Sequence, residues 1–240
     1  MKIIKTIFKK ELSSFTSTPI AYIYIVSFLL FVNWYFFRTF FVVGQASLRN
    51  LFDLLPWILL LLVPAVSMRS WSEEKKSGTL DFLLTFPIQD WELVLGKFLA
   101  SLVLISVTIL GTCPLIILVI ISGSPDIGPI LTGYLGAILL SGSYLAIGLF
   151  ISSLTQNQII AFILTAIMCF FSYVMSQNFV AYALPDAIIP LLNHISLGFH
   201  YESMMIGVID SSDIVFHLSF IGFFLYLNCA VLGARKLGSQ

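Results

Sequence analysis

The sequence contains few charged residues, and these make up 10% of its 240 positions, against about 25% in a soluble domain. Hydrophobic residues account for 59% of the chain. A soluble domain of this size cannot carry so many apolar residues, because its outer surface must face water. This composition excludes a soluble enzyme, a disordered protein and a coiled coil.

Sequence motifs of catalysis and cofactor binding are also absent. The chain has no Gly-x-x-x-x-Gly-Lys-Ser/Thr phosphate loop, no Gly-x-Ser-x-Gly and no His-Glu-x-x-His. Cys113, Cys169 and Cys229 lie far apart in apolar runs, which predicts buried thiols rather than disulfides or a zinc site. Twelve basic and twelve acidic residues cancel, so no net charge attracts nucleic acid. We expect a non-catalytic chain without a cofactor, whose energy source lies elsewhere.

Long uncharged runs recur along the chain and predict an all-α polytopic membrane protein with a single domain over residues 1–240. A transmembrane helix needs ~20 mostly apolar residues. Pro56 and Pro64 in the second run, and Pro114 in the third, predict bends. Six runs are long enough: Ile20–Val43, Leu51–Met68, Leu93–Ile121, Ile130–Leu154, Ile159–Tyr182 and Asp213–Gly233.

The distribution of Lys and Arg predicts the orientation. Ten of the twelve lie in the N-terminal segment, the second connection and the C-terminal segment, whereas Arg38 and Arg49 fall on the other side. An even number of spans puts both termini on one side, and the basic bias puts that side in the cytoplasm. The spans contain almost no ionisable side chains, which disfavours a proton- or ion-coupled carrier. Gly133, Ala137 and Ser141 recur every four residues and favour close helix contact.

Residues 1–19 have the pattern of an amphipathic helix lying in the lipid headgroup layer. Apolar residues including Phe8 recur at helical spacing, while Lys5, Lys9 and other lysines occupy the remaining faces. Pro19 should end this interfacial helix. The alternative is a basic orientation signal without fixed structure.

Residues 69–92 form the most patterned connection. Its charged first part should extend the second span until Gly78 interrupts the helix. Thr79 could then cap a short helix from Leu80 to Phe86, which Pro87 would stop. This helix places five large apolar side chains outside the membrane, where the protein's own helices or another subunit must cover them. They are Leu80, Phe82, Leu83, Leu84 and Phe86.

Residues 183–212 form a long apolar connection without Lys or Arg on the external side. Such a segment is not a plain tether, and we expect it to fold back against the bundle as a re-entrant loop. Its His194, His200 and Gly207 are candidates for an external gate. A metal site at the histidines is the alternative, but their spacing is not diagnostic.

The stretch R-S-W-S-E-E-K-K-S-G-T-L-D-F-L-L-T-F-P-I-Q-D-W-E-L-V-L-G-K-F-L-A resembles the permeases of type-2 ABC transporters, the ABC-2 family. The resemblance includes an acidic-basic cluster, then Gly-Thr-Leu, a short apolar helix, Pro-Ile, and Gly-Lys opening the third span. Met205–Asp210 and the closing Arg235-Lys236 also look like the family. The short six-span form is most similar to bacterial permeases linked to gliding motility and to nitrous-oxide reductase maturation.

This resemblance implies an exporter half in the bacterial inner membrane. Two permease chains, identical or different, would pair, and two separate ATPase subunits carrying ATP and magnesium would dock beneath them. The short helix would be the coupling helix, residues 2–16 would lie beside it, and an external accessory protein could join. The implied ATPase-coupling residues are Glu73, Glu74, Gly78, Thr79, Leu80, Phe82, Leu83, Leu84, Phe86 and Pro87.

Two other functions stay open at this point. The chain could anchor an ATPase-driven machine, for example for gliding or secretion, and move no solute itself. It could also be a membrane enzyme that modifies lipid, although no catalytic constellation is visible. An ATPase stimulated by a transported substrate would separate the exporter from the anchor.

Overall fold

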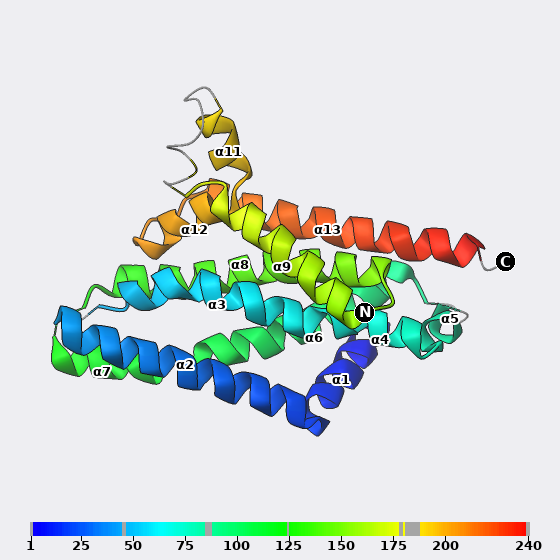
Figure 1. Ribbon diagram of the computed structural model, residues 1–240, viewed down its shortest axis with the longest axis horizontal. Helices are drawn as coiled ribbons and strands as arrows, with labels where there is room; N and C mark the ends of the chain where they lie inside the picture. The colour runs from blue at the N-terminus through cyan, green and yellow to red at the C-terminus, as the bar shows by residue number, and fades with distance from the viewer. Residues whose placement is uncertain are drawn as a thin grey trace.

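The computed structural model describes residues 2–44, 47–84, 88–123, 125–177, 180 and 188–238, and every regular element in these ranges is helical. The predicted all-α class is therefore confirmed. The long helices run side by side along the longest axis of the molecule (Figure 1). The helices are α1 (Lys2–Ser17), α2 (Pro19–Val43), α3 (Arg49–Ser67), α4 (Arg69–Lys76), α5 (Thr79–Leu84), α6 (Asp90–Leu110), α7 (Pro114–Ser122), α8 (Ile127–Leu154), α9 (Gln158–Val174), α11 (Ile189–Ile195), α12 (Leu197–Met205) and α13 (Ser211–Gly238).

Five helical runs within the described residues are long and apolar enough to cross a membrane. The predicted fifth span, Ile159–Tyr182, corresponds to α9, which has only 17 residues, and its predicted end lies outside the described residues. Helix α9 still runs along the bundle (Figure 1), so a sixth crossing remains a prediction. The five runs are Ala21–Val42, Arg49–Lys76, Asp90–Ser122, Ile127–Leu154 and Ser211–Lys236.

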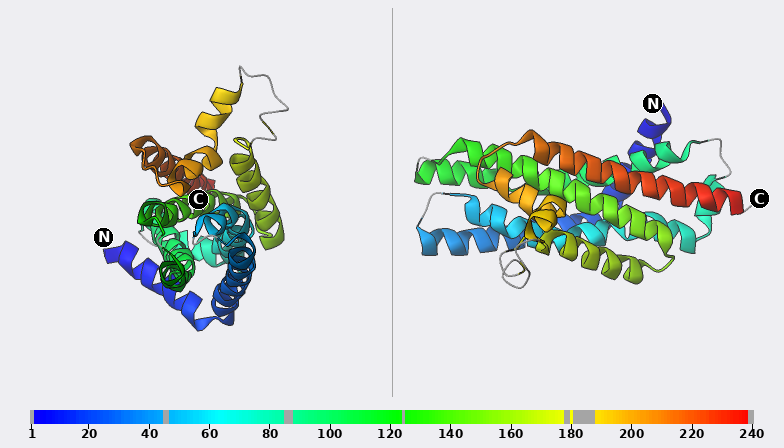
Figure 2. Two further views of the ribbon diagram at one scale, coloured as in Figure 1. Left: turned by 90° about the vertical axis from the view of Figure 1, so that its left-hand side faces the viewer. Right: turned by 90° about the horizontal axis from the view of Figure 1, so that it is seen from above.

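The two ends of the bundle differ in character (Figure 1). Helices α1, α4 and α5, the start of α9 and the end of α13 gather at one end, here called the α5 end. Helices α7, α11 and α12 lie toward the opposite end, the α12 end, where α11 stands away from the bundle (Figures 1 and 2). The three basic segments of the sequence therefore meet at the α5 end.

The prolines act in two ways. Pro114 follows a turn at 111–113 and starts α7, so the third predicted span is divided there as expected. Pro56 and Pro64 lie within α3, which continues through both positions. Met68 keeps helical backbone angles between α3 and α4, which confirms that the charged segment extends the second span.

Helix α8 is at the centre and packs against α3, α6, α9, α12 and α13. Its small residues permit this close packing. A Cβ atom at Gly133 would lie 2.7 Å from the ring of Phe52, and one at Gly148 would overlap Oγ of Ser67. Both neighbours belong to α3, so the predicted close helix contact along α8 is present in the structure.

Candidate functional site

The junction of α3 and α4 is held by the C-terminal end of α8. The Ser152 hydroxyl accepts hydrogen bonds from the backbone N–H groups of Trp71 (3.1 Å) and Ser72 (3.2 Å). It also donates to the Met68 carbonyl oxygen (3.0 Å). The first N–H groups of a helix have no partners within it, so Ser152 supplies a cap from another helix and fixes the direction of α4.

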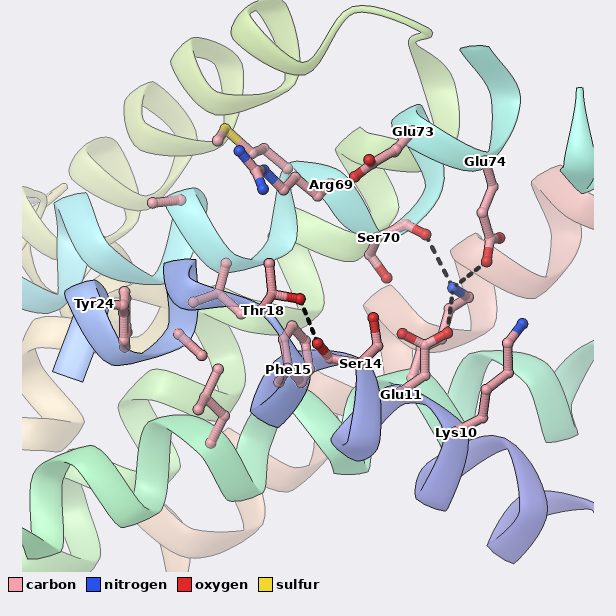
Figure 3. Close-up of a pocket in the computed structure, with 16 residues that line it drawn as sticks. Lys10, Glu11, Ser14, Phe15, Thr18, Tyr24, Arg69, Ser70, Glu73 and Glu74 are labelled. Carbon is pink, nitrogen blue, oxygen red and sulfur yellow. Dashed lines mark hydrogen bonds and ion pairs between the residues drawn. The ribbon is translucent and has the colours of Figure 1, made fainter. Parts of the chain in front are cut away.

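A buried ammonium group joins three helices at the α5 end. Lys97 of α6 is only 3% exposed, and its Nζ lies 2.9 Å from Oε1 of Glu11 on α1 and 2.7 Å from Oε1 of Glu74 on α4. It also donates to the Ser70 carbonyl oxygen at 3.1 Å (Figure 3, dashed lines), and it lies 4.9 Å from the centre of the Trp71 ring. A buried charge needs such partners, so α1, α4 and α6 are linked by one side chain.

Gly96 allows α1 to reach this position. A Cβ atom at Gly96 would lie 2.7 Å from Cγ2 of Ile7, so a larger residue would push α1 away from α6. The predicted helix over the N-terminal segment is present, and Thr18 leaves the helical conformation before Pro19. Phe8 is half-buried, while Lys5 and Lys9 are exposed. Part of the apolar side of α1 therefore packs on α6 rather than on lipid.

Helix α5 begins after Gly78, whose φ of 71° lies in the left-handed region that favours glycine. Thr79 is already in the helix, so it is not the preceding cap residue that the sequence suggested. Its hydroxyl instead donates to the Glu74 carbonyl oxygen at 3.3 Å. Glu73, Gly78 and Thr79 are exposed, and Glu74 is half-buried in its ion pair with Lys97.

The apolar residues of α5 do not share one environment. Leu80 is 0% exposed within the main core, and Leu83 is half-buried against the same core. Phe82 is 67% exposed. Of the two covers expected for these residues, Leu80 and Leu83 use the protein's own helices, because positions three apart share the face that meets the bundle. Leu84 ends α5. Two further predicted residues, Phe86 and Pro87, lie outside the described residues.

The α12 end contains a buried polar cluster around His200, which is 8% exposed. Its Nδ1 donates to Oδ1 of Asp213 at 2.7 Å, and the Ser203 hydroxyl donates to the other oxygen of the same carboxylate. The His200 ring stacks on Phe216 with 3.9 Å between centroids. The cluster fastens α12 to the first turns of α13, so His200 has a structural partner set.

The side chains of the other two gate candidates do not join this cluster, although the His194 carbonyl oxygen lies 3.3 Å from Nε2 of His200. His194 is exposed, and its Nδ1 is 2.7 Å from the Pro190 carbonyl oxygen. Gly207 has a φ of 97° and lies against Pro129. Near it, the Ser212 N–H donates to Asp210 and lowers the pKa of that carboxyl. In the described ranges no three His, Cys, Asp or Glu side chains are placed to hold a metal ion.

These features define a polytopic helical membrane protein. One end of it carries the buried ion pairs of Lys97 and the short, partly exposed helix α5. A family model described as "ABC-2 family transporter protein" matches residues 5–214. Because the match covers most of the chain, the chain belongs to this family. It is a membrane permease component of an ABC transporter, a class that works in the bilayer with ABC ATPase partners. No curated protein matches the chain.

Proposed function

We propose that this chain is one of two permease subunits of an ATP-driven exporter in a bacterial cytoplasmic membrane, with the α5 end and both termini in the cytoplasm. Separate ATPase subunits would dock on α5 and α1. The substrate would pass between two permease bundles. The basic segments at the α5 end support this orientation, and membership of the ABC-2 family supports the ATPase partner.

The arrangement of α5 supports its role in coupling most directly. Leu80 fixes the helix in the core of the bundle, whereas Phe82 projects outward. A helix held on one face and exposed on the other can transmit a push from a docked subunit. Ser152 holds α4 against α8, and Lys97 ties α4 to α1 and α6. A displacement of α5 on ATP binding would therefore move several helices together, as packed elements do.

The test compares two carboxylate substitutions on α5. Phe82→Asp should leave folding and membrane abundance unchanged, because the side chain is exposed, but should reduce ATPase co-purification several-fold. An unpaired carboxylate in a dry protein contact costs several kcal/mol. Leu80→Asp should instead lower the amount of folded permease, because it places the same charge in the core. The matched control is Ile206→Asp, at an exposed position of the α12 end.

Normal ATPase binding by Phe82→Asp at equal membrane abundance would show that α5 is not the docking element. Transport in inside-out vesicles then separates the two functions. An exporter should show ATP-dependent substrate uptake that Phe82→Asp abolishes. Intact ATPase binding without uptake of any tested substrate would favour the membrane anchor, which the resemblance to gliding-motility permeases suggests.

A further inference from the structure

A cavity of about 430 Å³ lies at the α5 end between α1, α2, α3, α4 and α6. Its two ends differ in chemistry (Figure 3). The apolar end lies where α2 begins and includes Ala21, Tyr24, Ala65, Val66 and Leu104. The polar end lies between α1 and α4 and includes Lys10, Glu11, Arg69, Ser70, Glu73 and Glu74. This gradient is that of a site for an amphiphile, whose polar group and hydrocarbon need different surroundings.

Three polar atoms around this cavity are buried without a hydrogen-bond partner in the described part of the chain. They are the Tyr24 hydroxyl, Nε of Arg69 and Oε2 of Glu74. Tyr24 as a whole is only 8% exposed. Buried polar groups in native proteins are nearly always paired, and leaving one unpaired is costly. An occupant should therefore accept hydrogen bonds from Tyr24 and Arg69 and donate one to Glu74.

The charges around the cavity narrow the class of occupant further. Three basic side chains, Lys10, Arg69 and Lys97, face three acidic ones, Glu11, Glu73 and Glu74. Lys97 already pairs with two of the carboxylates. A ligand bearing only negative charge would satisfy Arg69 but would leave Oε2 of Glu74 without a donor. A headgroup with both a phosphate and an ammonium group meets both needs, since guanidinium binds phosphate well.

We propose that this cavity binds one zwitterionic phospholipid with a primary ammonium group, of the phosphatidylethanolamine type. Arg69 holds the phosphate, and Glu73 and Glu74 accept hydrogen bonds from the ammonium. The Tyr24 hydroxyl donates to an ester carbonyl oxygen at the start of an acyl chain. The cavity takes the headgroup and the first carbons, while the rest of the chain lies in the bilayer. The lipid then bridges α1 and α4 beside Lys97.

Binding can be measured on the purified permease without an ATPase, so the result does not depend on the proposed export function. Delipidated protein in detergent is titrated with dioleoyl-phosphatidylethanolamine or dioleoyl-phosphatidylglycerol, and bound lipid is counted by native mass spectrometry. We expect one phosphatidylethanolamine per chain, bound about tenfold more tightly than phosphatidylglycerol. Glycerophosphoethanolamine, which lacks acyl chains, should bind much more weakly.

Two variants test the residues. Arg69→Gln should weaken phosphatidylethanolamine binding by about tenfold, and Tyr24→Phe by about fivefold, as expected for a charged and a neutral hydrogen bond. Tyr24→Phe keeps the ring and should leave thermal stability unchanged. The matched controls Arg49→Gln and Tyr226→Phe, at exposed positions, should bind normally. Equal binding of the two lipids, tighter binding of phosphatidylglycerol, or equal binding by variants and controls would overturn the proposal.

Discussion

Lys97 shows how a residue with an ordinary place in the sequence can organise a structure. The Gly-Lys pair at the start of the third span belongs to the family resemblance, but nothing in the sequence assigns partners to its ammonium group. Glu74 lies 23 residues away and Glu11 lies 86 residues away. Only packing reveals that α1 passes close enough to α6, at Gly96, for all three side chains to meet. Pattern analysis predicted the helices but could not predict this contact.

Lys97→Met should therefore destabilise the permease strongly. The substitution leaves the carboxylates of Glu11 and Glu74 facing each other in a partly buried site without a cation. Removing one partner of a buried charge pair costs about 3–5 kcal/mol, so the midpoint of thermal unfolding, followed by tryptophan fluorescence, should fall by several degrees. Lys9→Met, which removes an exposed lysine from α1, is the matched control and should leave the midpoint unchanged.

The triple variant Lys97→Met, Glu11→Gln, Glu74→Gln makes this prediction specific to charge. Because it removes the two uncompensated carboxylates together with the cation, it should recover part of the lost stability. If Lys97→Met unfolds at the same temperature as the unchanged protein, the ion pairs do not hold α1 to the bundle. If the triple variant is no more stable than Lys97→Met, the loss comes from packing rather than from charge.

Among the elements, the predictable ones have apolar residues at regular helical spacing or a proline or glycine that ends the helix. Helix α1, the division at Pro114 and the extension of α3 into α4 all follow from local sequence. The faces of α5 did not, because six residues give too short a pattern to separate a buried side from an exposed one. The segment from 183 to 212 was expected to fold back as short helices, but the ends of α11 and α12 were not predictable, since they depend on contacts such as His200 with Asp213.

The junction of α3 and α4 gives a prediction at the scale of elements. Ser152→Ala removes the hydroxyl that accepts from two backbone N–H groups and donates to the Met68 carbonyl. Loss of a helix cap costs about 1–2 kcal/mol, and here the unpaired groups are buried. We expect a lower thermal midpoint and faster amide hydrogen exchange at Trp71 and Ser72. In Ser122→Ala, an exposed serine bonded only within its own helix, neither quantity should change.

Amide exchange distinguishes a local effect at the junction of α3 and α4 from a general loss of stability. If Ser152→Ala lowers the midpoint but exchange rises evenly along all helices, Ser152 acts through global packing. If neither the midpoint nor the exchange at α4 changes, water replaces the hydroxyl as a cap and α4 does not depend on α8. An increase in amide exchange at α4 alone would show that Ser152 holds the junction of α3 and α4.

For the whole molecule, the distribution of charge agrees with the arrangement of the helices. The N-terminal, α4 and C-terminal basic segments lie at one end of the bundle (Figure 1). We expect this end to face the cytoplasm. After replacement of the three native cysteines, Ser211→Cys should react with an impermeant maleimide in intact cells. Ser77→Cys should react only after the membrane is opened. Both positions are exposed, so access and not burial decides the result. Labelling of Ser77→Cys from outside would show that the orientation is the opposite of the one expected here.

The described residues fill the middle of a single bundle around its central helix. The middle of the central helix α8 is completely buried, with Tyr144, Leu145 and Ile147 all 0% exposed. The cavity described above lies at the α5 end among α1, α2, α3, α4 and α6. We therefore expect a path for a transported molecule to form between two chains, against apolar faces such as that of α2, where Leu30 and Trp34 are exposed.

A complex purified with its ATPase should therefore contain two permease chains, and the permease alone should hydrolyse no ATP. Native mass spectrometry gives the number of chains directly. Leu30→Cys or Trp34→Cys in a chain without other cysteines should form a disulfide to its partner if α2 lies near the symmetry axis, whereas Tyr226→Cys on α13 serves as the lipid-facing control. One permease chain per pair of ATPase subunits, without any second membrane subunit, would contradict this assembly and would require the path to open within a single bundle.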